Sequence, residues 1–182
     1  EKLDDTGKKI HTGRSRNDQV LVALRLYMKE NLKKMQSSAL ALAQDFLVKA
    51  KEYQNVPLPG YSHTQQAMLS SVGHYYCSFL EALLGDITYI QSVLQQIDCC
   101  PLGSAAGFGV SLPLDRKQVA DRLGFSTVQL NSLYCQNSRG KFESMYLEAC
   151  VQIMMTLGKF ASDILLFTSQ EFDFFTVDES LV

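Results

Sequence analysis

Apolar residues recur along the first third of the chain at steps of three and four, which is the spacing of one face of an α-helix. The series predicts a helix over about residues 18–53, and no proline or glycine interrupts it before Pro57. At 1.5 Å per residue such a helix is about 50 Å long, which favours a bundle of long helices. The apolar positions are Leu21, Leu24, Met28, Leu32, Met35, Ala39, Leu42 and Phe46.

Two further helical series follow after a break at residues 57–60 (PLPG). They predict helices over about 64–98 and about 141–171, and the short connection makes the first two helices antiparallel neighbours. The apolar positions are Met68, Val72, Tyr76, Phe79, Leu83, Ile87, Ile90, Leu94 and Ile97, then Phe142, Tyr146, Cys150, Ile153, Leu157, Phe160, Ile164 and Phe167. The second helix also carries apolar residues beside this stripe, so burial between subunits is one way to cover it.

The segments between the helices carry turn-forming residues. Residues 101–114 (PLGSAAGFGVSLPL) predict a loop, which lacks the Gly-Lys-Ser/Thr ending of a phosphate-binding loop. A short helix is predicted from about Asp115, closed by Gly124. The remaining segments are predicted to be irregular: 1–16, 125–140 and 172–177. The predicted fold class is all-α, a bundle of three long helices with short helices and loops.

Composition narrows the class of protein. The chain has 182 residues, of which 46% are hydrophobic and 20% charged, as in a globular domain with a sizeable core. A net charge of −2 gives no electrostatic basis for binding nucleic acid or an anionic membrane. No uninterrupted apolar run approaches the roughly 20 residues that span a bilayer.

The five cysteines form no Cys-x-x-Cys pair, and the three histidines form no His-x-x-x-His pair. This pattern fits neither a disulfide framework nor a zinc site, and it suits a reducing, cytoplasmic compartment. We therefore predict no metal.

Three polar stretches lie at the ends of the predicted helices: 11–19 (HTGRSRNDQ), 61–66 and 136–141. Two arginines and small polar residues at a helix N-terminus suit a carboxylate or a phosphate. The alternative is that Asn17 or Asp18 only caps the helix while the arginines lie in solvent. His63, near a predicted helix N-terminus, is either a neutral acid/base group or a turn residue bonded to backbone. Arg139 alone is compatible with a surface ion pair.

These stretches resemble the signatures of the argininosuccinate lyase family, within the fumarase/aspartase superfamily. Residues 11–19 are similar to its first signature and residues 59–65 (PGYSHTQ) to its second, with Ser62 where the family usually has threonine. Three further motifs fit in order and spacing: 101–104 (PLGS), 112–116 (LPLDR) and 137–141 (NSRGK). The resemblance covers nearly the whole chain.

The resemblance implies reversible cleavage of argininosuccinate to arginine and fumarate without a metal or an organic cofactor. Carried over by motif, Arg16, Asn17 and Ser62 bind substrate, and His63 serves in acid/base catalysis. Gln65 and Arg139 are weaker assignments, either contacting substrate or supporting residues that do. The resemblance also implies a cytoplasmic homotetramer with active sites shared between subunits, acting in arginine biosynthesis or the urea cycle, with neither nucleic acid nor membrane as partner.

Two departures accompany the resemblance. The family's third signature, a Gly-Ser-Ser-x-Met-Pro-x-Lys loop with the catalytic serine, does not occur in the sequence, and Gly140 replaces a common acidic residue. We therefore expect residues 1–182 to be an incomplete central helical domain, without the N-terminal remainder, the serine loop and the C-terminal domain, and inactive alone. Two alternatives remain open: another superfamily lyase, such as an adenylosuccinate lyase or an aspartase-like enzyme, or a crystallin-like structural relative without activity.

Overall fold

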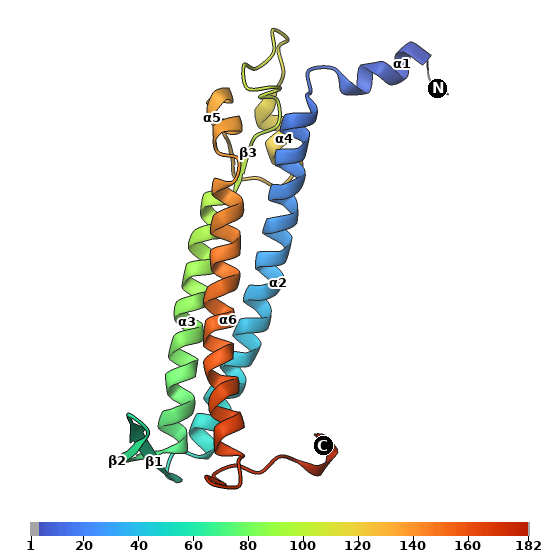
Figure 1. The fold of residues 1–182 in the computed structure, drawn as a ribbon. Helices are drawn as coiled ribbons and strands as arrows, with labels where there is room; N and C mark the ends of the chain where they lie inside the picture. Colours follow the sequence, from blue (N-terminus) through green and yellow to red (C-terminus); the bar gives the residue numbers. More distant parts are fainter. Residues whose placement is uncertain (1–3, 182) are drawn as a thin grey trace. The chain divides into compact units, whose positions relative to one another are not determined.

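The computed structural model describes residues 4–181, and Figure 1 shows the order of their elements along the chain. Three long helices dominate these residues: α2 (Arg16–Glu52), α3 (Val72–Ile97) and α6 (Lys141–Phe167). The shorter elements are α1 (Asp4–Lys8), the 3-10 helix η1 (Lys9–His11), β1 (Pro57–Ser62), β2 (Gln65–Ser71), β3 (Cys99–Cys100), α4 (Arg116–Arg122), β4 (Thr127–Val128), α5 (Ser132–Asn137) and the 3-10 helix η2 (Glu179–Leu181). The predicted all-α class with long helices is confirmed.

The chain divides into two compact units. Unit 1 contains the residues up to Lys34 together with Gln91–Leu147, and unit 2 contains Met35–Ile90 together with the residues from Glu148 on. Each of the three long helices contributes one part to each unit. The units are described one at a time below.

Unit 1 combines a small apolar core with buried charged side chains. The core residues are Val22, Cys100, Ala120 and Phe125. Arg25 is only 2% exposed, and its guanidinium donates hydrogen bonds to the Cys99 carbonyl and to Gln129 Oε1, the latter at 2.6 Å. It also lies 4.1 Å from the centroid of the Phe142 ring. These partners offset the cost of removing a charge from water.

Lys29, one helical turn further along α2, is also buried in unit 1. It forms an ion pair with Asp98 and donates to the Gly124 carbonyl at 2.6 Å. Next to Asp98, the two-residue strands β3 and β4 pair in parallel, with Cys99 opposite Thr127. Buried polar groups therefore connect α2 to segments far away in the sequence.

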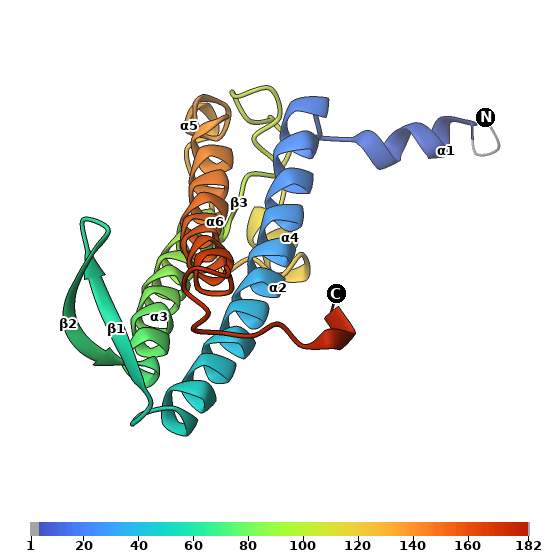
Figure 2. The same ribbon diagram turned by 60° about the horizontal axis from the view of Figure 1, so that its bottom comes forward.

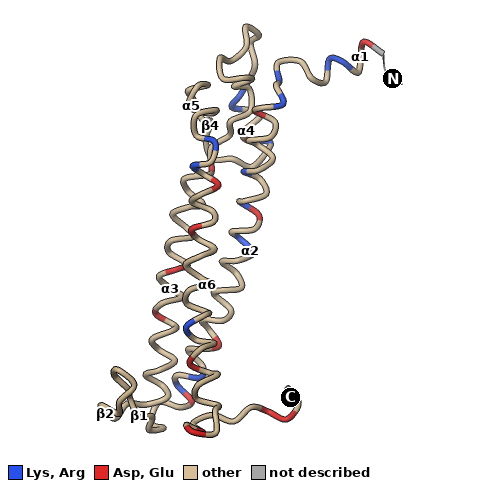
Figure 3. Tube along the Cα trace, in the orientation of Figure 1, with Lys and Arg blue, Asp and Glu red and all other residues tan. Residues whose placement is uncertain are grey.

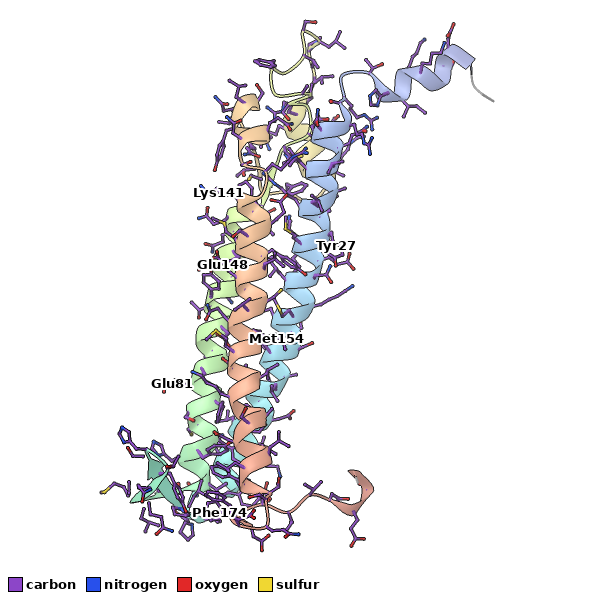
Figure 4. All side chains as sticks on the ribbon, in the orientation of Figure 1. Tyr27, Glu81, Lys141, Glu148, Met154 and Phe174 are labelled. Carbon is purple, nitrogen blue, oxygen red and sulfur yellow. The ribbon has the colours of Figure 1, made fainter. Side chains whose placement is uncertain are left out.

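Unit 2 is built around aromatic rings. Phe46 of α2 packs against Phe160 of α6 with ring centroids 4.8 Å apart, and Phe79 of α3 lies 5.2 Å from the same ring. Near the end of α6, Phe174 lies 5.5 Å from Phe167 (Figure 4). The rings are tilted or edge-on, which is the favoured geometry for aromatic pairs. Apolar packing thus holds this unit together.

The start of the predicted second helix is wrong, because residues 65–71 form β2 and α3 begins at Val72. β2 pairs antiparallel with β1, and Figure 2 shows the hairpin extending from the N-terminal end of α3. The prolines of the break at 57–60 prevent a helix there, and this segment instead forms β1. The pairing of β1 with β2 satisfies the backbone N–H and C=O groups of both strands. Ser71 then caps α3, since its Oγ accepts the backbone N–H of His74 at 3.1 Å.

Three other boundaries can be compared with their predictions. The helix after Asp115 is confirmed as α4, with the Asp115 carboxylate accepting from the N–H of Gln118 and Gly124 at φ 72° behind it. The segments 1–16 and 125–140 are not irregular throughout, because the first contains α1 and η1 and the second contains β4 and α5. Asn131 caps α5. α6 ends at Phe167, four residues before the predicted end.

α6 is the one helix among residues 4–181 that is long and apolar enough to cross a membrane, judged by length and composition. Only 11% of its most apolar window is buried, and Met154 illustrates the exposed apolar surface (Figure 4). Lys159 and Asp163 interrupt the apolar sequence. Buried helices of water-soluble proteins meet the same criteria, so length and composition alone do not assign a membrane span. Because so little of this window is buried, α6 has an uncovered apolar surface.

Candidate functional site

The first signature ends in a capped helix start in unit 1. Ser15 Oγ accepts the backbone N–H of Asn17 at 3.3 Å, and the Asp18 carboxylate accepts the N–H of Ser15 at 2.9 Å. The two side chains satisfy N–H groups that a helix leaves unpaired, in the manner of a capping box, although Ser15 accepts from Asn17 and not from Asp18. The predicted helix start is confirmed, and Ser15 and Asp18 share the capping.

Arg16, Asn17 and Arg139 come together at this helix start. Arg16 is the first residue of α2, and Arg139 Nη2 donates to the Asn17 carbonyl at 3.5 Å. All three side chains are exposed, and within the described residues no hydrogen bond or ion pair engages the Arg16 guanidinium. Two arginines at the positive end of a helix dipole are an arrangement that favours the binding of an anion. Figure 3 shows basic residues in blue at the start of α2 and in the segment before it.

A cavity of about 400 Å³ lies beside the first signature in unit 1. Thr12, Gly13 and Arg14 line it, together with Gly103 and Arg116 from the later segments. The predicted contacts Arg16 and Asn17 are not among the lining residues. Arg14 and Arg116 were not predicted as site residues from the sequence.

Asp18, which the sequence predicted only as a possible helix cap, is a further functional candidate in unit 1. It is fully buried, and its second carboxylate oxygen accepts the N–H groups of Gly103 and Ala105 at 3.0 and 2.9 Å. The spacing Ser15-x-x-Asp18 is a local signal for the capping box. The loop contact has no local signal, because its partners lie 85 and 87 positions further along the chain.

Ser62, His63 and Gln65 lie at the tip of the β1–β2 hairpin in unit 2, and all three are exposed. The turn residues His63 and Thr64 have φ of 53° and 62°, positive at both positions as in type I′ turns. Ser62 Oγ lies 2.8 Å from His63 Nδ1. The expectation that His63 lies near a helix N-terminus is wrong, because the hairpin separates it from α3, and the dipole argument does not apply to it.

A second cavity, of about 630 Å³, lies beside the hairpin in unit 2. Tyr61, Thr64, His74, Tyr75 and Asp163 are among its lining residues. Burial raises the pKa of the Asp163 carboxyl above its ordinary value. Burial also raises the pKa of Tyr75, and the negative charge of Asp163 adds to the shift. Residues of the second signature, such as Tyr61 and Thr64, thus line this cavity, whereas His63 is not among the lining residues.

The six predicted residues thus form two groups: Arg16, Asn17 and Arg139 in unit 1, and Ser62, His63 and Gln65 in unit 2. Each group presents polar side chains to solvent at the end of a long helix or on a hairpin. Across residues 4–181, acidic, histidine and cysteine side chains form no group that could hold a metal ion.

The family model and the curated relatives that match this chain are all described as lyases. Residues 1–180 match the family model described as "Lyase". The argininosuccinate lyase of Xylella fastidiosa (strain Temecula1 / ATCC 700964) is 45% identical over 177 residues, which are 97% of this chain and 40% of that protein. The argininosuccinate lyase of Sorangium cellulosum (strain So ce56) is 46% identical over 179 residues, 98% of this chain and 42% of that protein. The chain therefore spans about 40% of the length of these curated relatives.

Solved structures show the same fold. A variant of EDDS lyase with bound fumarate matches with a TM-score of 0.91 at 24% identity, covering 94% of this chain and 34% of that chain. A fumarate lyase:delta crystallin from Brucella melitensis bound to cobalt matches with a TM-score of 0.83 at 19% identity, covering 93% and 38%. At such identities the likeness concerns the fold alone.

Proposed function

Because the chain belongs to the lyase family whose model its residues match, we propose that the full-length protein is an argininosuccinate lyase. It would carry out the reversible β-elimination of argininosuccinate to arginine and fumarate. The observation that carries the proposal is 45% identity to an argininosuccinate lyase over 97% of the chain. The residues of the two polar groups come from the first two signatures and, for Arg139, from the motif 137–141 that also suggested this family.

The arrangement in unit 1 supports a role in binding the substrate carboxylates. Arg16 offers a guanidinium that has no hydrogen-bond or ion-pair partner among residues 4–181, and Asn17 and Arg139 lie at the same helix start. During elimination, a proton leaves the carbon beside a succinyl carboxylate and charge accumulates on that carboxylate. Cationic groups fixed in advance stabilise this charge without having to reorganise.

The hairpin in unit 2 supports a role in proton transfer and substrate binding. The contact between Ser62 Oγ and His63 Nδ1 orients the imidazole and leaves Nε2 for exchange with substrate. Gln65 pairs with Ser62 across the turn, so it supports the same tip. We assign acid/base work to His63 and substrate contacts to Ser62 and Gln65. No step requires a metal or an organic cofactor.

We further propose that complete sites form between copies in a homotetramer. The resemblance of residues 11–19 and 59–65 to the signatures of the argininosuccinate lyase family supports this, because that family shares its active sites between subunits. The group in unit 1 and the group in unit 2 would then each act with groups from other subunits. The exposed apolar surface of α6 would then be covered by further copies, and not by lipid.

The assembly has a direct test in the full-length protein. Arg16→Ala and His63→Asn are each expected to be inactive, and co-expression of the two variants is expected to restore part of the activity, because some shared sites then contain both native residues. Light scattering should give the mass of four subunits. A lack of restored activity in hybrid oligomers would refute shared sites.

The activity is tested by following fumarate release, by ultraviolet absorbance, from argininosuccinate, adenylosuccinate and aspartate. Release from argininosuccinate alone is expected, and preference for another substrate would assign the protein to another lyase of the superfamily. No turnover of any of them would favour a structural role. A polypeptide of residues 1–182 is expected to be inactive, because it contains no serine loop.

Cellular context follows from the same proposal. The five cysteines are free thiols, as expected for a protein in the reducing cytoplasm. Arginine biosynthesis or the urea cycle is the corresponding process. Fractionation of cells that express the full-length protein would test this location.

A further inference from the structure

We infer that Asp18 is a positioning residue for the part of the site that binds the substrate carboxylates, an inference that rests on the proposed function. Asp18 is fully buried, so it does not contact substrate. Its carboxylate instead holds together the first turn of α2 and the glycine-rich loop 101–109. Through these bonds it fixes the direction in which Arg16 and Asn17 face the ligand.

The bonds of Asp18 connect two separate segments. Its Oδ1 accepts from the backbone N–H of Ser15 at 2.9 Å, and its Oδ2 accepts from Gly103 and Ala105 at 3.0 and 2.9 Å. Hydrogen bonds to an ionised acceptor are about twice as strong as neutral ones. The position in the first turn of a helix also favours the negative charge.

Capping alone does not explain this arrangement. A capping box needs one oxygen, whereas the second oxygen of Asp18 serves only the loop. In that loop Ala105 has φ 50°, an uncommon conformation for a residue with a side chain. Gln136 Nε2 donates to the Ala105 carbonyl at 3.1 Å, so a second tether holds the same residue. A strained residue fixed by two tethers indicates a loop whose exact position matters.

The hydrogen bonds of Asp18 affect the ligand-binding residues Arg16 and Asn17 directly. Arg16 and Asn17 lie between Ser15 and Asp18, the two residues that the capping box connects. Their backbone direction therefore depends on the carboxylate of Asp18. A displacement of about 1 Å in a positioned group can lower activity about 100-fold, so this buried acid controls how well the exposed groups bind a dicarboxylate.

The test uses Asp18→Asn in the full-length enzyme, with inhibition constants for the two products as the readout. The amide keeps the size of the side chain, but one of its ends donates and cannot accept from the loop or from Ser15. We expect the KM for argininosuccinate and the Ki for fumarate to rise about tenfold or more, because the groups that bind the succinyl carboxylates are displaced. The Ki for arginine, which lacks the succinyl carboxylates, should stay within about twofold, whereas general loss of structure would raise both inhibition constants.

Lys29→Met is the matched control, because it removes another buried charge from α2 in unit 1. It should lower thermal stability while leaving both inhibition constants unchanged. If Asp18→Asn changes stability but not the ratio of the two constants, the inference is wrong.

Gln136→Leu keeps the inference testable if Asp18→Asn does not fold, since it removes only the second tether of Ala105. A smaller rise in the Ki for fumarate alone would support the inference, and unchanged constants would overturn it. If the native enzyme does not cleave argininosuccinate, the proposed function fails by itself. Calorimetric binding of succinate to the native protein and to Asp18→Asn then decides the inference separately.

Discussion

The two units hold their candidate residues in different ways. In unit 1, buried polar groups such as Arg25, Lys29 and Asp18 connect α2 to loops and short strands. In unit 2, aromatic rings around Phe46 and Phe160 form the core, and the candidate residues project on an exposed hairpin. Hydrogen bonds are directional whereas apolar packing is not. Unit 1 is therefore suited to fixing the geometry of a site, and unit 2 to anchoring a projecting tip.

The largest expected effect is in the core of unit 2. Phe46→Ala should lower the free energy of unfolding by about 3–5 kcal/mol, because it leaves a cavity among packed rings. Phe46→Leu should recover more than half of this loss, since neighbouring rings can close on another apolar side chain. Urea unfolding of the full-length protein measures both. Equal losses for the two variants would show that this core, too, depends on exact shape.

The corresponding change in unit 1 should respond differently to a conservative replacement. Arg25→Met should cost about 3 kcal/mol, because the Cys99 carbonyl and the Gln129 amide oxygen lose their donor inside the protein. Arg25→Lys should recover little, since a single ammonium cannot replace the planar fork of donors. Lys34→Met, which removes an exposed ion pair, is the control and should have no measurable effect. Full recovery with lysine would contradict the proposed importance of direction.

The acids of the two units should respond to pH with opposite sign. Burial alone would raise the pKa of Asp98, but hydrogen bonds from Lys29 and Ser126 outweigh it and hold the pKa below its ordinary value of about 3.8. Its stabilising contribution is present above that value and is lost as pH falls through the lower folded pKa. Asp163 has a raised pKa, so its contribution is present at low pH and is lost as pH rises through that pKa.

Asp98→Asn should therefore destabilise the protein at neutral pH and have less effect in acid. Asp163→Asn should stabilise it at neutral pH, with the difference shrinking in acid. Unfolding measured from about pH 3 to about pH 7 compares them. The same sign for both variants at neutral pH would remove this contrast between the units.

The smallest expected effect concerns the turn of the hairpin. Thr64 is β-branched and has φ 62°, which is strained, so Thr64→Gly should stabilise the protein by up to about 1 kcal/mol. Ala67→Gly in β2, where no such strain exists, should instead cost about 0.5–1 kcal/mol. Thermal unfolding of both variants measures the difference. A destabilising Thr64→Gly would mean that contacts of the threonine side chain outweigh the strain.

The sequence by itself determined the parts of the fold that depend on local periodicity and capping. The long apolar series predicted α2 and most of α3 and α6, and Asp115 and Gly124 predicted the ends of α4. The first two signatures and the motif 137–141 contain the six predicted site residues, and three of these, Arg16, Asn17 and Arg139, lie together in unit 1. Each of these predictions relied on residues within a few positions of one another or on family resemblance.

Only the tertiary structure decided the features that depend on distant partners. The β1–β2 hairpin displaced the predicted start of α3 because pairing with β1 satisfied the backbone of residues 65–71, and His63 consequently lies on a turn. The role of Asp18 depends on Gly103 and Ala105, which no local spacing connects to it. A hydrogen bond between remote segments leaves no periodic pattern in the sequence, so the first signature predicted an anion site without the buried carboxylate that holds it in place.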